Sequence, residues 1–164
     1  MIDKINFLFV TLFGIGKIKK IPGSVASLVT TIFLFFLLHI LKISPNFILV
    51  LVIIIFFISL YAVNIFIKNL DNKDPKEVVI DEFIGQSIPI CLYEIAHEGS
   101  KEASQVLTSY FIMFVLFRIF DILKPYPVSY YDKNFKNSFG VIMDDVAAGL
   151  YVVAVLVLYM VFTS

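Results

Sequence analysis

Long apolar runs separated by short polar stretches make up most of the chain. Three runs, residues 24–41, 47–67 and 141–162, reach about the 20 residues that a helix needs to cross a bilayer. Two shorter runs, residues 83–95 and 106–120, predict helices that cross at a tilt, dip in as a hairpin, or pack against the longer three. The pattern predicts an all-α integral membrane protein with about five helices, three of them clear spans and two of them short.

The amino-terminal apolar run, residues 5–13, follows a lysine, as in a secretory signal. It is only nine residues long, and no small-residue cleavage site follows it. We therefore expect an interfacial or packed helix at this position. With 164 residues in total, the chain predicts one membrane domain that spans residues 1–164.

The composition agrees with a membrane protein. Hydrophobic residues make up 60% of the chain and the mean hydropathy is +0.95, whereas a soluble domain is roughly 45–50% apolar. The formal net charge is zero, which gives no reason to expect a nucleic-acid partner. The single cysteine, Cys91, excludes a disulfide framework, and His39 and His97 match no metal-ligand spacing.

Basic residues are unevenly distributed over the polar connections. If all the apolar runs cross, eleven basic residues fall on one side of the membrane, and only Lys42 and Lys101 fall on the other. Because positive charge accumulates on the cytoplasmic side, the sequence predicts a multi-pass protein of the inner (cytoplasmic) membrane. The amino terminus is expected inside and the carboxyl terminus outside, and four polar clusters then meet at the cytoplasmic face.

Two of these clusters contain paired carboxylates. VIDEFIGQ (residues 79–86) contains Asp81 and Glu82, and MDDVAAGLY (residues 143–151) contains Asp144 and Asp145. One acid suffices to cap a helix N-terminus, whereas two in a row at a membrane boundary are costly and are expected to be functional. Oxygen ligands of this kind suit Mg²⁺, which takes a few carboxylates together with substrate phosphate.

The third cluster, FRIFDILKPYP (residues 117–127), contains Arg118, the only arginine among 13 basic residues. Arg118 and Asp121 are three residues apart and share a helix face. A surface ion pair with a snorkelling lysine is one interpretation. In the other, Arg118 binds phosphate as a planar fork, Lys124 adds a point charge, and Asp121 either orients the arginine or binds metal.

The fourth cluster, GIGKIKKIPGSVAS (residues 14–27), precedes the first span. Gly23, Ser24 and Ser27 lie at a helix start, where free N–H groups could hold an anion, and the lysines would attract anionic headgroups. A turn with positive-inside lysines explains this cluster about as well. Together the four clusters favour phosphoryl chemistry on an anionic phospholipid.

In chain order, GIGKIKKIPGSVAS, VIDEFIGQ, FRIFDILKPYP and GVIMDDVAAG resemble the motifs of the phosphatidylglycerophosphatase A family. The resemblance runs from residue 14 to residue 149. It departs at Ser24, where threonine is usual, at Ala26, where glycine is usual, and at Tyr126, where tryptophan is common. It implies an all-helical, Mg²⁺-dependent phosphatase that converts phosphatidylglycerophosphate to phosphatidylglycerol in phospholipid biosynthesis.

With this resemblance, we expect metal-assisted hydrolysis of a phosphate monoester. The expected metal ligands are Asp81, Glu82, Asp144 and Asp145; the further catalytic residues are Arg118, Asp121 and Lys124; and the substrate-binding residues are Gly23, Ser24, Ser27, Arg118 and Lys124. The number of Mg²⁺ ions, the choice between water and an aspartyl-phosphate intermediate, and the oligomeric state stay open. The alternative is a small cation transporter that uses the same carboxylates, but the middles of the three long runs carry no charge.

Overall fold

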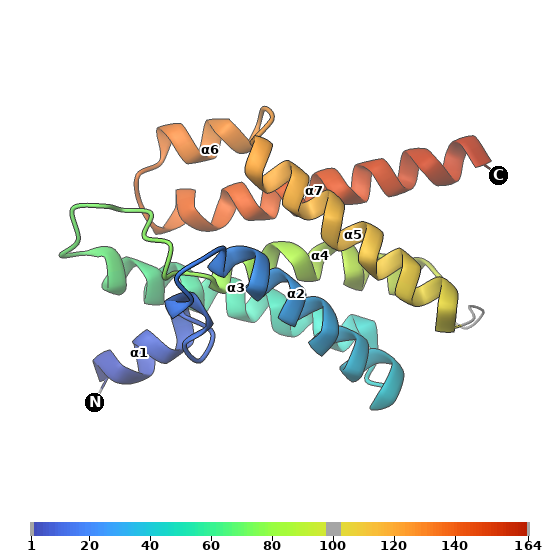
Figure 1. Cartoon of the computed structure of the whole chain (residues 1–164), viewed down its shortest axis with the longest axis horizontal. Coiled ribbons are helices and arrows are strands. Elements are labelled where there is room, and N and C mark those ends of the chain that lie inside the picture. The colour runs from blue at the N-terminus through green and yellow to red at the C-terminus, as the bar shows by residue number, and fades with distance from the viewer. Residues whose placement is uncertain (1, 98–102, 164) are drawn as a thin grey trace.

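The computed structural model of the protein describes residues 2–97 and 103–163, and within them every regular element is helical. In chain order the elements are α1 (Ile2–Val10), η1 (Ile15–Lys17), α2 (Pro22–Phe35), η2 (Phe36–Ile40), α3 (Pro45–Ile67), α4 (Ile80–Ala96), α5 (Ala103–Leu123), α6 (Val128–Asn134) and α7 (Ser138–Thr163) (Figure 1). The predicted all-α class is confirmed. The described residues contain seven α-helices, more than the predicted number, because the short helices α1 and α6 add to the longer ones.

Four helical segments are long and apolar enough to cross a membrane: Pro22–Ile40, which joins α2 to the π-helical turn η2, Pro45–Ile67, Ser104–Leu123 and Ser138–Phe162. These helices make the chain a membrane protein. The apolar run 106–120, expected to be short, belongs to a helix of 21 residues. The sequence pattern underestimated its length because polar residues such as Ser104 and Asp121 lie inside the helix at its two ends.

Helix α4 lies in the interior of the bundle, in contact with α2, α3, α5 and α7 (Figure 1). It has 17 residues and is not one of the four candidate spans. Its apolar run is short because residues such as Gln86 and Ser87 are polar yet fully buried, as polar residues that face the interior of a helix bundle are. The helix continues through Pro89, which has no N–H to donate to the carbonyl group of Gly85.

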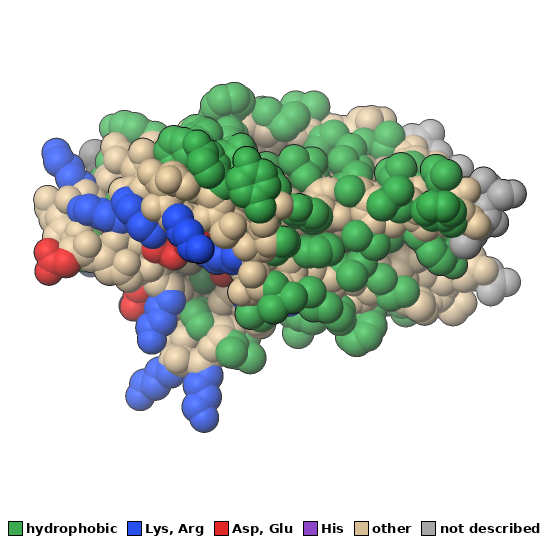
Figure 2. Space-filling model, turned by 90° about the horizontal axis from the view of Figure 1, so that it is seen from above, with side chains coloured by type: hydrophobic (Ala, Val, Ile, Leu, Met, Phe, Trp, Pro, Cys, Tyr) green, Lys and Arg blue, Asp and Glu red, His purple; other side chains and the backbone are tan. Residues whose placement is uncertain are grey.

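The two ends of the bundle differ chemically. Helices α2, α4 and α7 begin, and α5 ends, at the same end (Figure 1). Lys and Arg side chains gather at this end, and hydrophobic side chains cover most of the remaining visible face (Figure 2). Lys42 follows η2 at the opposite end, while Lys101 lies outside the described residues.

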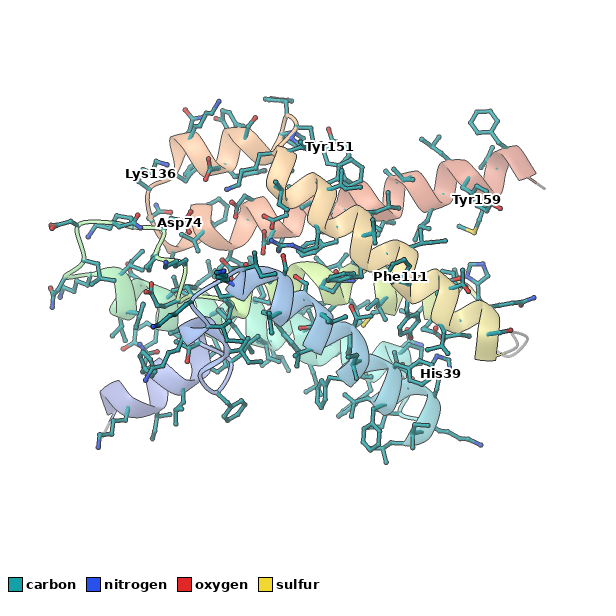
Figure 3. The ribbon with its side chains drawn as sticks, in the orientation of Figure 1. His39, Asp74, Phe111, Lys136, Tyr151 and Tyr159 are labelled. Carbon is teal, nitrogen blue, oxygen red and sulfur yellow. The ribbon has the colours of Figure 1, made fainter. Side chains whose placement is uncertain are left out.

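At the end away from the basic residues, one polar cluster joins three helices. His39 Nε2 lies 3.3 Å from Glu94 Oε1 and 3.4 Å from the hydroxyl oxygen of Tyr110. Figure 3 shows His39 at this end and Asp74 and Lys136 at the other. The cluster ties η2 to α4 and α5, and these are the helices whose opposite ends meet at the basic end.

Helix α1 packs against α3. Asn6 Nδ2 donates a hydrogen bond of 3.0 Å to the carbonyl oxygen of Ala62, and the rings of Phe7 and Phe66 lie 6.1 Å apart. The amino-terminal segment, expected to be interfacial or packed, is therefore a packed helix next to the basic end of the bundle.

Candidate active site

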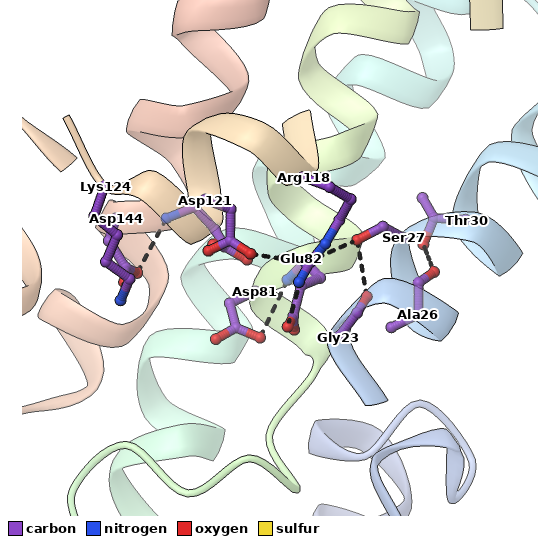
Figure 4. Close-up of polar contacts among 11 residues, drawn as sticks. Gly23, Ala26, Ser27, Thr30, Asp81, Glu82, Arg118, Asp121, Lys124 and Asp144 are labelled. Carbon is purple, nitrogen blue, oxygen red and sulfur yellow. Dashed lines mark hydrogen bonds and ion pairs between the residues drawn. The ribbon is translucent and has the colours of Figure 1, made fainter. Parts of the chain in front are cut away.

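Four helices bring side chains together at the basic end of the bundle (Figure 4). Helices α2 and α4 contribute their first turns, α5 its last turns, and α7 its second turn. Helix α2 begins at Pro22, whose fixed φ suits a first helical position. Helix α5 ends because Lys124 adopts a left-handed φ of 45° immediately before Pro125. The four sequence clusters predicted to meet at one membrane face therefore do meet.

Asp81, Glu82 and Asp145 form a compact group of carboxylates. Each offers an oxygen, and the three oxygens lie within 4.8 Å of one another. Glu82 Oε2 and Asp145 Oδ2 are buried and have no hydrogen-bond partner among the residues that the structure describes. Buried carboxylate oxygens without partners are costly unless a cation binds them. The three residues therefore fit a divalent metal ion that takes hard oxygen ligands.

Arg118 connects α5 to α2 and α4. Its Nη1 lies 2.7 Å from Asp121 Oδ2, 3.4 Å from Ser27 Oγ and 3.9 Å from Glu82 Oε1. The short pair with Asp121, one helical turn away, fixes the direction of the guanidinium group. Arg118 Nε is buried and has no partner within the described ranges, so one donor of the planar fork is not used by the protein.

Gly23 is the point where α2 approaches the acidic residues. A Cβ atom at this position would overlap Glu82 Oε1 and would lie 3.3 Å from Arg118 Nη1. Ser27 donates a hydrogen bond of 2.9 Å to the Gly23 carbonyl oxygen and accepts one from Arg118. Gly23 and Ser24 occupy the first turn, where backbone N–H groups have no acceptor within the helix. Half-buried Ser24 thus contributes a backbone donor to the positive end of α2.

Lys124 joins the loop after α5 to α6 and α7. Its Nζ donates hydrogen bonds of 2.7 Å to Asp132 Oδ1 and 2.8 Å to Asp144 Oδ2. Burial by itself lowers the pKa of Lys124, but the two carboxylates outweigh it and hold that pKa above its usual value. Lys124 is therefore a cation at neutral pH. The structure also divides the predicted metal ligands, because Asp144 pairs with Lys124 while the next residue, Asp145, belongs to the compact group.

Two residues of the site had no predicted role. Asp132 on α6 is the second partner of Lys124. The one feature of the sequence that could have indicated it is that no other acid lies between Asp121 and Asp144. Gln86 follows Glu82 by one helical turn and is fully buried. Neither its Oε1 nor its Nε2 has a partner in the described part of the chain. The sequence pattern showed only that Gln86 and Glu82 share a helix face.

The formal charges of the site do not balance. Six carboxylates and two cations meet here: Asp81, Glu82, Asp121, Asp132, Asp144 and Asp145 with Arg118 and Lys124. Each cation is paired to specific acids, and neither has an ion pair within 4 Å to Asp81 or Asp145 among the described residues. Concentrated like charge in a buried site is unfavourable. One or two divalent cations would offset it.

Comparison with known proteins agrees with this chemistry. The family model for phosphatidylglycerophosphatase A matches residues 8–160. A protein of Haemophilus influenzae named phosphatidylglycerophosphatase A is 34% identical over 143 residues, which cover 87% of this chain and 81% of the relative. A protein of the same name from Escherichia coli is 28% identical over 84% of this chain and 73% of the relative.

A third relative has a different name. A protein of Bacteroides thetaiotaomicron, provisionally named a phosphatidylinositol-3-phosphatase, is 35% identical over 85% of this chain and 83% of the relative. No solved structure matches the chain. The comparisons identify the protein as an enzyme, a phosphatase, and give no support to the transporter alternative. The resemblance expected from the four motifs is confirmed: the chain belongs to the phosphatidylglycerophosphatase A family.

Proposed function

We propose that the protein is a Mg²⁺-dependent lipid phosphatase that hydrolyses the phosphate monoester of phosphatidylglycerophosphate to give phosphatidylglycerol in phospholipid biosynthesis. The observation that carries the proposal is the group of Asp81, Glu82 and Asp145 oxygens within 4.8 Å of one another, next to the only arginine of the chain. The names of two relatives support the substrate. All three names describe phosphatases of phospholipids.

Asp81, Glu82 and Asp145 are the proposed metal ligands, with Asp144 as a further one if a second ion binds. A bound Mg²⁺ would supply charge neutralisation at the phosphate and would lower the pKa of a coordinated water. The proposed role of Asp121 is to hold the guanidinium group of Arg118 towards Glu82, as their 2.7 Å contact supports.

The remaining residues of the site bind the phosphate group in this proposal. Arg118 offers planar donors that match phosphate oxygens, and Lys124 adds positive charge where negative charge develops on the transferred group. The N–H groups of Gly23 and Ser24 at the start of α2 would donate to a phosphate oxygen. Ser27 would keep Arg118 in reach of this helix end through their 3.4 Å contact.

The proposed location of the site is the cytoplasmic face of the inner membrane. The clustering of lysines around the site end supports this orientation (Figure 2). A reporter enzyme that is active only outside the cytoplasm, fused after residue 164, would be active if the orientation is right. An inactive reporter on a folded fusion protein would contradict the orientation and leave the chemistry unaffected.

Phosphate release by the purified protein in detergent micelles tests the reaction. We expect release from phosphatidylglycerophosphate with Mg²⁺, no release with excess EDTA, and recovery when Mg²⁺ is added back. Phosphatidylinositol 3-phosphate and phosphatidic acid in the same micelles test the substrate. Phosphate release only from one of these two lipids would contradict the proposed substrate but would still agree with the proposed phosphatase reaction. No release from any of the three by folded protein would contradict both.

A further inference from the structure

An apolar groove runs along the outside of the bundle between α6 and α7. Its volume is about 290 Å³, and its walls include Pro127, Tyr131, Met143, Ala147, Leu150 and Ala154. Leu150 is 51% exposed, so the groove is open to the surroundings of the helix bundle. In a membrane-spanning helix such as α7, these surroundings are lipid.

One end of the groove meets the candidate active site. Met143 precedes Asp144 in sequence, and Ala147 lies one helical turn from Asp144 on the same face of α7. On the other wall, Tyr131 precedes Asp132. Because Lys124 donates to both Asp132 and Asp144, its ion pairs close this end of the groove with polar groups. A molecule in the groove would therefore have an apolar body and a polar end. Because Asp132 and Asp144 together outweigh the charge of Lys124, a negatively charged end would need the cation proposed for the neighbouring acid group.

The length of the groove matches one leaflet of a bilayer. From Met143 to Ala154 the rise along α7 is roughly 16 Å at about 1.5 Å per residue. The hydrocarbon core of a bilayer is about 30 Å thick, so a chain from one leaflet occupies about half of it. An acyl chain with its headgroup at the Lys124 end would thus lie along the whole groove.

Aromatic contacts fix the position of the connection between α5 and α6. The hydroxyl group of Tyr151 donates to the carbonyl oxygen of Tyr126, and the ring of Tyr151 stacks on Phe120 with 5.0 Å between centroids. Figure 3 shows Tyr151 beside the end of α5 that leads into this connection. The groove is therefore bounded by a connection that is anchored to α7, which favours a preformed binding site.

We propose that the α6–α7 groove binds an acyl chain of the lipid substrate and thereby places the headgroup phosphate beside Lys124 and Asp144. This inference rests on the proposed lipid phosphatase function. A second apolar groove of about 290 Å³ lies between α3, α4 and α7, and its walls include Leu49, Val52 and Phe57. Ile84 and Met143 also line this second groove, so it too reaches the site end of the bundle. None of its lining residues among the described ones comes from α6 or from the α5–α6 connection, so it does not adjoin the segments that carry Lys124 and Asp132.

A kinetic experiment separates chain binding from catalysis. The variant Ala154→Phe fills the distal part of the α6–α7 groove, and the matched control Ile53→Phe adds the same ring to the other groove. The substrates are dioleoyl phosphatidylglycerophosphate in mixed micelles and a water-soluble dibutyryl analogue with the same headgroup. We expect Ala154→Phe to raise KM for the dioleoyl lipid about tenfold, with little change for the dibutyryl analogue and with wild-type kinetics for Ile53→Phe.

The other outcomes are distinguishable. Three results would each overturn the groove assignment. The KM of Ala154→Phe for the long-chain lipid could stay unchanged, or its activity on both substrates could fall equally. Alternatively, Ile53→Phe could lose activity on the long-chain lipid alone. Wild-type protein that hydrolyses neither substrate would instead contradict the proposed function.

A direct binding measurement does not depend on turnover. The chain contains no tryptophan, so Leu150→Trp and Ile53→Trp each introduce a single fluorophore. In detergent with EDTA, phosphatidylglycerophosphate with brominated acyl chains should quench the indole of the Leu150→Trp variant more strongly than brominated phosphatidylcholine does. The fluorescence of the Ile53→Trp variant should not distinguish the two lipids. Equal quenching of the Leu150→Trp variant by both lipids would overturn the proposal.

Discussion

Gly149 of α7 packs directly against the carbonyl oxygen of Gly85 in α4. In turn, a Cβ atom on Gly85 would lie 2.6 Å from the carbonyl oxygen of Asp145. The Gly85 carbonyl is available for this contact because Pro89, four residues later, has no N–H group. The two backbones therefore touch between the acid pair of α4 and the acid pair of α7, and this contact sets the distance between the pairs.

The first prediction concerns this contact. Gly149→Ala should push α7 away from α4, because the added methyl group meets backbone that cannot rotate away. We expect a loss of about 1–3 kcal/mol in the free energy of unfolding, the range for overpacked sites, and a higher Mg²⁺ concentration for half-maximal activity. Thermal unfolding in detergent and Mg²⁺ titration of phosphate release measure the two effects. Val157→Leu, on the exposed face of α7, is the control, and equal behaviour of the two variants would contradict the prediction.

The second prediction concerns the arginine. In Arg118→Lys the charge stays, and one ammonium group could replace Nη1, which makes all the contacts to Asp121, Ser27 and Glu82. It cannot replace the planar fork whose Nε donor is left free for a phosphate oxygen. We expect kcat to fall about 100-fold, as when one preorganised donor is lost from a transition state. Steady-state phosphate release measures it. Lys133→Arg, at an exposed position of α6, should be neutral, and near-wild-type kcat in Arg118→Lys would show that any cation suffices.

The third prediction separates the two neighbouring aspartates of α7. Both Asp145→Asn and Asp144→Asn should abolish turnover, but only Asp144→Asn should lower the stability of the protein without metal. Asp145→Asn removes a charge from a group of unpaired carboxylates and should not lower the melting temperature. Asp144→Asn removes one of the two partners of Lys124 and should cost about 1 kcal/mol, as for a partly exposed ion pair.

Metal binding gives the same prediction a second readout. A ligand at 100 times its Kd stabilises a folded protein by about 2.7 kcal/mol, so Mg²⁺ should raise the melting temperature of the wild type. The increase should be lost in Asp145→Asn. An increase of equal size in that variant would exclude Asp145 as a ligand, and substantial turnover in both variants would refute the metal assignment.

The sequence predicted the parts of this protein that depend on local composition. A run of about 20 apolar residues must form a helix in lipid, because its backbone groups have no other partners there. Consecutive spanning helices run in opposite directions, so the start of one lies at the same face as the end of the next. This alternation predicted that Asp81, Arg118 and Asp145 lie at one face, although their contacts were not known.

The features that depend on contacts between distant segments could not be predicted. Helix α6 has only seven residues, and its place is set by rings from three segments, such as Tyr131 against Phe135 and Phe139 at 6.0 and 6.2 Å. Lys124 and Asp132 are eight residues apart, and they pair because α6 folds back towards the end of α5. Asp144 and Asp145 have different partners because of the rotation of α7 about its axis. The sequence does not reveal this rotation, because apolar residues occur on every side of α7 after Asp145.

The last prediction concerns Gln86, which is fully buried and has no partner for its amide group in the described part of the protein. A buried polar group without a hydrogen bond costs about 1–3 kcal/mol, so a residue kept there against this cost is expected to act on a ligand. Gln86→Met has similar volume and no amide. We expect an unchanged or higher melting temperature together with a fall in kcat/KM of about tenfold, equivalent to about 1.4 kcal/mol of transition-state binding.

The neighbouring Ser87→Ala, which removes only a hydroxyl bonded to the Phe83 carbonyl oxygen, should keep its activity. Full activity in Gln86→Met would exclude a role at the site, and a lower melting temperature would show that the amide stabilises the fold instead.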